Sequence, residues 1–273
     1  MTPRLKFSAA LLGATATFLS GCGLGTGTNT TSRVRLFDAL VNGPVAGVSF
    51  VERGVPLNIA TPVTYGQFSP GATSTTPAQY YTVVSGGSSI TGAGVNTDVY
   101  SYPSISGTTL APEQSFLLDP HTAGSTNGTY TMAVAGITGS TTAPPTLYRF
   151  IDDAPAISGT TPTTFLRVIN LAPDTAGTTG LSVDSNNQPI AGLTNIAYGS
   201  PSSSSSYVPI QIVGSSTLSL SIRFGAANQV VTTVTPLNAV NLLVGHAYTL
   251  FLIGEVNPVN GAPALDAVLT EDE

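Results

Sequence analysis

The chain has 273 residues, enough for one large domain or two ordinary ones. Only 8 % of the residues are charged, and 8 Lys and Arg stand against 14 Asp and Glu. A nucleic-acid binder needs a basic face that neutralises phosphates, so this class is excluded, and electrostatic docking to anionic lipid is disfavoured for the same reason. With 41 % hydrophobic residues, the composition also differs from that of a charge-rich disordered chain.

Residues 1–22 have the layout of a secretory signal. Arg4 and Lys6 give a positive start, residues 7–19 form an uncharged, largely apolar core, and small residues follow. The core is shorter than the roughly 20 residues that a membrane-spanning helix needs. We therefore predict a signal peptide over residues 1–21 that is removed from the mature protein.

The only cysteine, Cys22, ends the stretch Leu19-Ser20-Gly21-Cys22. This stretch resembles the bacterial lipobox, in which the cysteine thiol receives a diacylglyceryl group and the signal is cut just before the cysteine. The alternative is an ordinary secretory signal with an incidental cysteine. Two or three acyl chains on Cys22 would hold the protein stably on a membrane. We predict lipid attachment at Cys22, followed by a flexible tether over residues 22–31.

Lipidation predicts a location in the cell envelope. Gly23 and Leu24 follow the cysteine and carry no acidic retention signal. In a bacterium with two membranes this resembles sorting to the outer membrane. The expected partner at this end of the chain is therefore the membrane itself.

The remainder of the chain contains two copies of one domain. Four segments recur in the same order: residues 35–39 and 167–172, 48–57 and 181–190, 130–136 and 248–254, and 145–153 and 263–271. The offset between copies is 133 at Tyr65 and Tyr198 but 118 at Tyr130 and Tyr248. The first copy therefore has about 15 extra residues, which we place in the loop-like stretch 103–128.

We predict two domains, over residues 32–155 and 163–273, joined by a linker at 156–162. Each unit of roughly 110 residues is long enough to bury its own core. Residues 218–224 alternate between apolar and polar, as in a half-buried strand, whereas 248–254 are apolar on both faces. Gly, Pro, Asn and Ser cluster between such runs, and no segment is convincingly helical. The pattern indicates an all-β chain of two tandem β-sandwiches of roughly immunoglobulin size, with a barrel as the alternative.

The motifs shared by the copies resemble a known family. Each copy has a strand that starts Arg-[Val/Leu], then a Tyr-Gly, then a Tyr-Thr strand that ends in Gly, and finally a short strand that ends in acidic residues, Asp152-Asp153 and Glu271-Asp272. Over nearly all of residues 33–273 this resembles the bacterial envelope family called domain of unknown function forty-three ninety-seven, often found in tandem. The resemblance implies secretion and β-sandwiches and no established activity. The histidine that the family usually carries after the first strand is missing at 38–42 and at 170–174.

Histidines and serines offer little chemistry. His121 and His246 fall in different copies, and a zinc site needs three or four converging ligands, so no metal site is expected. We interpret His246 as a turn residue. The five serines at 202–206 lie in a low-complexity loop, and no G-x-S-x-G elbow exists, which disfavours a hydrolase.

The acidic residues suggest two kinds of site, a glycosidase pair and a calcium site. A glycosidase needs two opposed carboxylates, whereas Asp commonly caps the backbone near turns, where the candidates lie: Asp119, Asp152, Asp153 and Asp174. Asp152-Asp153 and residues 271–273 offer oxygen ligands for calcium, but no spaced D-x-D-x-D-G loop supports such a site. We interpret both as solvated strand ends.

The expected function is that of a non-enzymatic, lipid-anchored envelope protein that presents two β-sandwiches for binding or adhesion. The partner expected is a glycan or another envelope protein, and no cofactor is expected. Residues 103–128, flanked by Tyr100 and Tyr102, are the best candidate for specificity because loops on rigid sandwiches commonly carry recognition. The alternatives are a purely structural spacer or assembly subunit and, after it, an unrecognised hydrolase.

Overall fold

A computed structural model describes most of the two repeats. The described residues are 31–52, 55–56, 62–69, 80–84, 95–101, 109–116, 118, 128–155, 162–201, 207–211, 217–225, 229–231 and 237–272. The predicted signal peptide, Cys22, nearly all of the tether and of the linker, Tyr102, Asp119, His121 and the serines at 202–206 lie outside them. Over the described ranges the chain is all-β, apart from a short 3-10 turn at Pro173–Thr175. Within these ranges no helix could span a bilayer.

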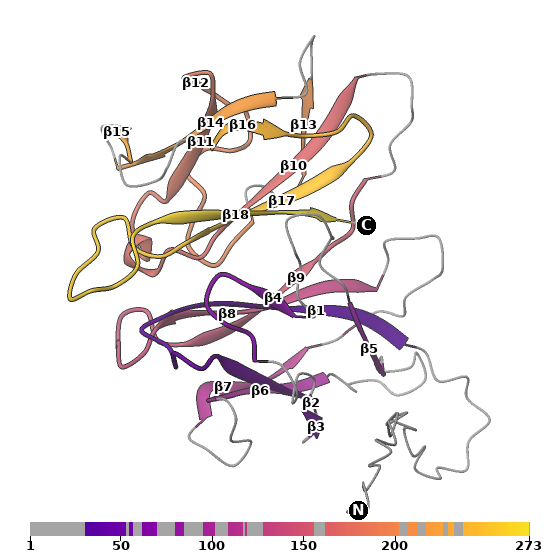
Figure 1. Cartoon of the computed structure of the whole chain (residues 1–273), viewed down its shortest axis with the longest axis vertical. Helices are drawn as coiled ribbons and strands as arrows, with labels where there is room; N and C mark the ends of the chain where they lie inside the picture. The colour runs from indigo at the N-terminus through magenta and orange to yellow at the C-terminus, as the bar shows by residue number, and fades with distance from the viewer. Residues whose placement is uncertain are drawn as a thin grey trace, which may run out of the picture.

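Domain 1 is a sandwich of two sheets (Figure 1). The first sheet has the order β4 (Phe68–Ser69), β1 (Thr31–Val41), β8 (Thr129–Ile137) and β9 (Thr146–Ile151), with β5 (Tyr81–Val84) also paired to β1. The second has the order β3 (Val55–Pro56), β2 (Val48–Glu52), β6 (Val95–Ser101) and β7 (Thr109–Phe116). A core that includes Leu36, Phe50 and Met132 lies between them.

Domain 2 repeats this plan. Its first sheet has the order β13 (Val208–Gln211), β10 (Thr163–Asn170), β17 (Ala247–Ile253) and β18 (Asp266–Asp272). Its second sheet has the order β12 (Gln188–Pro189), β11 (Leu181–Ser185), β14 (Thr217–Phe224) and β15 (Gln229–Val230), with β16 (Leu237–Asn241) also on β14. The separate core between these sheets includes Val183, Ile222 and Leu250.

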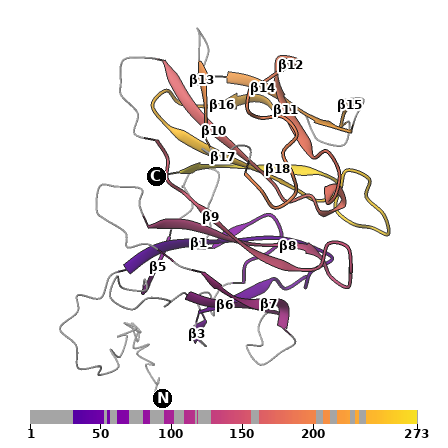
Figure 2. The same ribbon diagram turned by 180° about the vertical axis from the view of Figure 1, so that it is seen from behind.

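The first sheets of the two domains face each other, so the molecule is a stack of four sheets. Figures 1 and 2 show β1, β8 and β9 beside β10, β17 and β18 in both views. This arrangement explains why β17 is buried along its whole length. Leu250 packs in the core of domain 2, and the next residue, Phe251, packs in a cluster between the domains. The predictions of a doubly covered strand here and of a half-buried strand in β14 are confirmed, since Leu220 and Ile222 are buried and Ser219 is exposed.

The predicted position of the extra residues in domain 1 is wrong. Strand β7 occupies Thr109–Phe116 and pairs with β6 as β16 pairs with β14, so it belongs to the shared plan. Val48 is equivalent to Leu181, at an offset of 133 residues. Their partners on the neighbouring strands, Ser101 and Phe224, are therefore equivalent too, and these differ by only 123 residues. Most of the extra residues therefore precede this position. The sequence of β7 resembled a loop because it contains Pro112, which an edge strand tolerates.

Both ends of domain 1 also differ slightly from the sequence prediction. β1 begins at Thr31, the last residue assigned to the tether, which pairs with Val84. At the other end, Tyr130 in β8 lies opposite Ile151 in β9, and Tyr248 in β17 lies opposite Glu271 in β18. The offset between the copies is therefore 118 residues from β8 to β17 but 120 residues from β9 to β18. Asp152 is therefore equivalent to Asp272.

Candidate functional site at the domain interface

An apolar layer joins the two domains. Three aromatic rings form its centre: Phe37 lies 4.7 Å from Phe251 and 4.5 Å from Phe68, measured between ring centroids. The buried members from both domains form one cluster: Phe37, Ala39, Phe68, Ala133, Ala135, Phe150, Ile169, Leu171, Phe251 and Ile253. Burial of such a surface is the main attraction that holds the domains together.

Two arginines enter this layer from equivalent strands. Arg35 in β1 and Arg167 in β10 are 0 % and 1 % exposed. Side chains alternate between the faces of a strand, so Arg35 points to the interface while its neighbours Val34 and Leu36 pack in the core of domain 1. A fully buried guanidinium is stable only when carboxylates and hydrogen-bond acceptors surround it.

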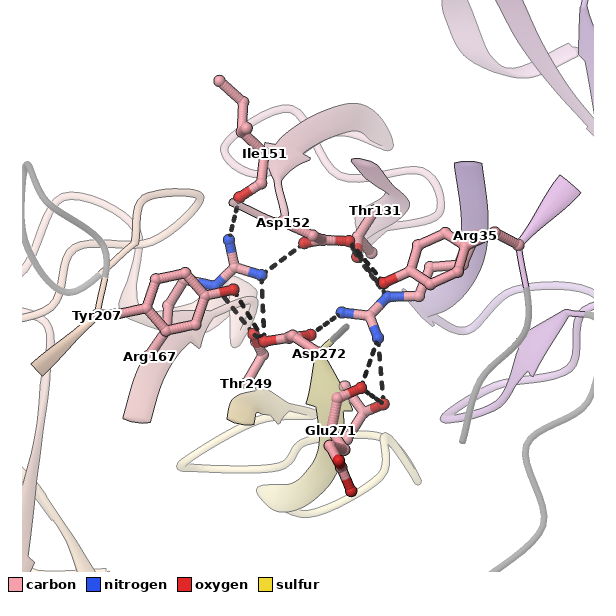
Figure 3. Close-up of polar contacts among 11 residues, drawn as sticks. Arg35, Thr131, Ile151, Asp152, Arg167, Tyr207, Thr249, Glu271 and Asp272 are labelled. Carbon is pink, nitrogen blue, oxygen red and sulfur yellow. Dashed lines mark hydrogen bonds and ion pairs between the residues drawn. The ribbon is translucent and has the colours of Figure 1, made fainter. Parts of the chain in front are cut away.

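Arg35 reaches across to domain 2 (Figure 3). Its Nε donates to Thr131 Oγ1 of its own domain at 2.7 Å. Its Nη2 donates to the carboxylate of Asp272, and its Nη1 donates to the carbonyl of Glu271 at 3.3 Å, both in the opposite domain. One side chain thus ties β1 and β8 to the end of β18.

Arg167 makes the equivalent contacts in the reverse direction. Its Nε donates to Thr249 Oγ1 of its own domain at 2.9 Å. Its Nη2 donates to Asp152 Oδ1 at 2.6 Å, and its Nη1 donates to the carbonyl of Ile151 at 2.5 Å, both in domain 1. The two arginines are therefore related by an approximate two-fold axis that passes between Asp152 and Asp272.

The remaining carboxylate oxygens are also satisfied. Asp152 Oδ2 accepts from Thr131 Oγ1 at 2.7 Å, and Asp272 Oδ2 accepts from Tyr207 at 2.9 Å and from Thr249 Oγ1 at 2.5 Å. Each carboxylate lies within salt-bridge distance of both arginines, with the longer contacts at 3.4 Å and 3.8 Å. The ring of Tyr207 stacks on Arg167, with 4.8 Å between the guanidinium carbon and the ring centroid. We call Arg35, Arg167, Asp152 and Asp272 the interdomain charge network.

Two positive and two negative charges balance in this network. Burial by itself lowers the pKa of Arg35, but the adjacent carboxylates outweigh it and raise that pKa above its ordinary value. Burial, together with Asp272, raises the pKa of Tyr207, so the phenol keeps its proton. Removal of one partner from such a network costs about 3–5 kcal/mol because an uncompensated charge stays buried. The network therefore strongly favours one relative orientation of the domains.

The polar contacts are symmetric, but the apolar layer is not. Ala133 lies beside Phe37 in domain 1, whereas the equivalent positions in domain 2 hold Phe251 beside Ile169. Likewise, Ala135 is equivalent to Ile253. Two copies of the domain 2 face would crowd their large side chains, and two copies of the domain 1 face would leave cavities. The sizes of these side chains therefore favour packing of domain 1 against domain 2 over packing of either domain against a copy of itself.

The interpretation of the acidic strand ends as solvated is wrong for two residues. Asp152 and Asp272 are 0 % and 5 % exposed and form ion pairs, whereas Asp153 is exposed as expected. The reason is that the outer face of each first sheet is covered by the other domain. Because one acidic side chain at each strand end points into that layer, its neighbour points to solvent.

Two other predictions concerned turn residues, and both are confirmed. His246 lies in the turn before β17, where its carbonyl accepts from the Phe165 N–H at 3.0 Å. Its Nδ1 lies 2.6 Å from Glu271 Oε1 on the surface. Asp174 caps a loop, since its carboxylate accepts from the N–H groups of Val256 and Asn257 at 3.1 and 2.9 Å. Among the described residues, no three His, Asp or Glu gather as a metal site.

The surface of domain 2 also carries two hollows. One, of about 510 Å³, lies between the end of β14, β15 and residues 256–259, and it exposes the apolar side chains of Val230 and Val259. The other, of about 340 Å³, is polar and lies over β11. Tyr100, which flanks the predicted recognition stretch 103–128, is part of β6 in domain 1.

Sequence reasoning did not single out Arg35 and Arg167 as partners of the acidic strand ends. The signal was available: an arginine occurs at the same place in each copy, flanked on both sides by apolar residues that belong in the core, as Val34-Arg35-Leu36 and Leu166-Arg167-Val168. A charge at such a place within a strand needs a buried partner. The partner residue itself cannot be found this way, because it belongs to the other domain.

Comparison with protein-family models and with curated proteins gives no match for this chain. The resemblance of its tandem motifs to domain of unknown function forty-three ninety-seven therefore stays a prediction.

Proposed function

We propose that this protein is a non-enzymatic, lipid-anchored protein of the cell envelope that holds two β-sandwiches as one rigid unit for binding or adhesion. The observation that carries the proposal is the interface between the domains. Arg35 and Arg167 each bind the opposite domain through buried, charge-assisted hydrogen bonds, which are stronger than neutral ones. A protein that presents a surface on domain 2 benefits from this rigidity, because the surface keeps a fixed position relative to the anchored domain 1.

The order of the domains along the chain supports an outward-facing role for domain 2. The first described strand, β1, begins at Thr31 and belongs to domain 1, so an anchor at Cys22 would attach through domain 1. The second sheet of domain 2 is then the layer farthest along the stack from the anchored domain (Figure 1). Both hollows described above lie in domain 2, and they support a recognition surface there in addition to residues 103–128, most of which lie outside the described residues.

Rigidity also favours binding in general. Ordering of flexible parts on association opposes affinity, and a preformed arrangement avoids that loss. A rigid pair of domains equally suits a structural spacer, which is the second candidate function. The two candidates differ in one respect, since a spacer needs no external ligand.

The anchor is tested by the mass of the mature N-terminus. The wild-type chain, a Cys22→Ser variant and a Thr26→Ser control in the predicted tether are expressed in a bacterial host and fractionated. We expect wild type and control to begin at an acylated Cys22 in the membrane fraction, and the Cys22→Ser variant to lack the lipid and leave that fraction. An unmodified Cys22 in the wild type would contradict the proposal, as would membrane retention of the Cys22→Ser variant.

A further inference from the structure

The polar hollow lies on the outer face of the second sheet of domain 2. This sheet is on the far side of the domain from the interdomain charge network (Figure 2). The hollow has a volume of about 340 Å³ and is lined by Thr179, Ser182, Asp184, Pro189, Thr194, Asn195 and Gly225. Its lining is thus dominated by hydroxyl, amide and carboxylate groups.

Two buried polar atoms beside this hollow have no partner. Asp184 is 0 % exposed; its Oδ2 accepts from Arg223 Nε, but its Oδ1 is shielded from solvent and accepts no hydrogen bond from the described protein atoms. The Oγ of Ser221 is also shielded from solvent and has no hydrogen-bond partner among the described protein atoms. Asp184 and Ser221 are directly opposite in the β11–β14 pairing, so their side chains share one face of the sheet. Unsatisfied buried polar atoms are uncommon in native proteins, and two of them side by side indicate a missing bridging group.

The acidic residue has a different place in the two domains. The positions of domain 1 equivalent to Asp184 and Arg223 are occupied by Val51 and Tyr100, and the position equivalent to Ser221 is occupied by Asp98. This cross-strand pair therefore has its acidic residue on β11 in domain 2 and on β6 in domain 1. The domain 2 arrangement places the carboxylate on the same strand as Ser182, where both residues line the hollow.

The chemistry of the hollow selects a neutral ligand rich in hydroxyl groups. The carboxylate of Asp184 disfavours anions, and the guanidinium of Arg223, its ion-pair partner, disfavours cations. Ser182 Oγ accepts from the Asn195 N–H at 3.0 Å, so its own hydrogen remains available for donation to a ligand. Adjacent hydroxyls of a sugar each donate and accept hydrogen bonds, which matches this mixed lining.

We propose that the hollow over β11 binds one neutral sugar residue, with a sugar hydroxyl donating to Asp184 Oδ1 and further contacts to Ser182 and Thr194. The inference rests on the proposed function in that the protein recognises something outside itself. A hydroxyl reaches Oδ1 only after the shielding side chains move slightly, so we expect affinity in the millimolar to micromolar range, about −4 to −8 kcal/mol. The sugar can be free or the end of an envelope glycan.

The test uses the full chain with Cys22→Ser, so that its result is independent of lipidation. Glucose, galactose, mannose and N-acetylglucosamine are titrated separately to about 20 mM, and dextran is titrated as a polymeric probe, with binding followed by calorimetry and by NMR of the ¹⁵N-labelled protein. We expect at least one probe to bind and to shift the amides of residues 179–195. Tighter binding of the polymer per sugar residue would identify a glycan as the source, and equal binding a free sugar.

Three variants assign the site. Asp184→Asn and Ser182→Ala should each weaken binding by about tenfold or more, because the first replaces a charge-assisted hydrogen bond to the ligand by a weaker neutral one and the second removes a hydrogen bond. Asp153→Asn, an exposed acidic residue of domain 1, is the matched control and should bind as the parent does. If Asp184→Asn fails to fold, Thr194→Val, at an exposed position, replaces it.

The proposal is overturned if no probe binds, or if Asp184→Asn or its replacement binds like the parent chain. It is also overturned if a crystal soaked with the probes shows only ordered water at Asp184 Oδ1. None of these results bears on the anchor at Cys22, whose test is the mass of the mature N-terminus.

Discussion

Asp38 offers the sharpest test of the equivalence between the two domains. It is 2 % exposed in β1, and its Oδ1 accepts from the Leu40 N–H at 2.9 Å. The equivalent residue of domain 2 is Asn170, whose Oδ1 accepts from the Ala172 N–H at 3.0 Å. Asn170 has a second role, since its Nδ2 donates to the carbonyl of Ile196 at 3.0 Å. An ionised aspartate lacks that donor.

The difference has a free-energy cost that depends on pH. Burial raises the pKa of Asp38 from 3.8 to about 7, opposed in part by the hydrogen bond from Leu40. Because the folded-state pKa lies above the unfolded one, the native state holds its proton more tightly, and stability is lost as pH rises from about 4 to about 7. At 1.36 kcal/mol for each pKa difference of one, the cost is at most about 2 kcal/mol at pH 5 and about 4 kcal/mol at pH 8.

We therefore expect Asp38→Asn to stabilise domain 1, by more at pH 8 than at pH 5. The measurement is chemical denaturation of the Cys22→Ser chain at both pH values, with NMR to separate the two domains. The mirror substitution Asn170→Asp is the control, and it should destabilise domain 2 increasingly as pH rises. A gain from Asp38→Asn that is equal at both pH values, or a loss, would refute the assignment of Asp38 as a buried group that holds its proton.

Two further predictions concern the interface and one loop. Arg35→Met should lower the free energy of unfolding by about 3–5 kcal/mol, because Asp272 loses its closest charged partner. Adding Asp272→Asn should recover part of this loss, because only the paired Arg167 and Asp152 then remain charged. Denaturation of the single and double variants checks both expectations. Gly254→Ala should destabilise more than Gly245→Ala, although φ is +84° and +85° at these residues. A Cβ at 254 would lie 2.3 Å from the Ala264 carbonyl oxygen, whereas nothing lies within 4 Å at 245; equal melting temperatures would count against this.

Patterns along the chain were sufficient to predict the fold class and the duplication. An alternating run such as residues 218–224 has one stable solution, a strand with one face in a core. The repeated Tyr-Gly motif identified equivalent turns, where Gly66 and Gly199 have φ values of +72° and +73°. The backbone N–H of Gly66 donates to the carbonyl of Asp38 at 2.7 Å, and that of Gly199 donates to the carbonyl of the equivalent Asn170 at 2.8 Å. These features are local, so they can be read along the chain.

The contacts between the domains could not be predicted in the same way. A pattern of period two shows that a residue lies on the outer face of a sheet, but it does not show whether water or another domain covers that face. For this reason the sequence predicted solvated strand ends at Asp152 and Asp272, although these residues are buried against Arg167 and Arg35. Strand β7 could not be predicted for a similar reason. Its segment is polar and has a weak strand preference of its own, and the pairing with β6 stabilises it as a strand. Both outcomes depend on contacts between distant parts of the chain.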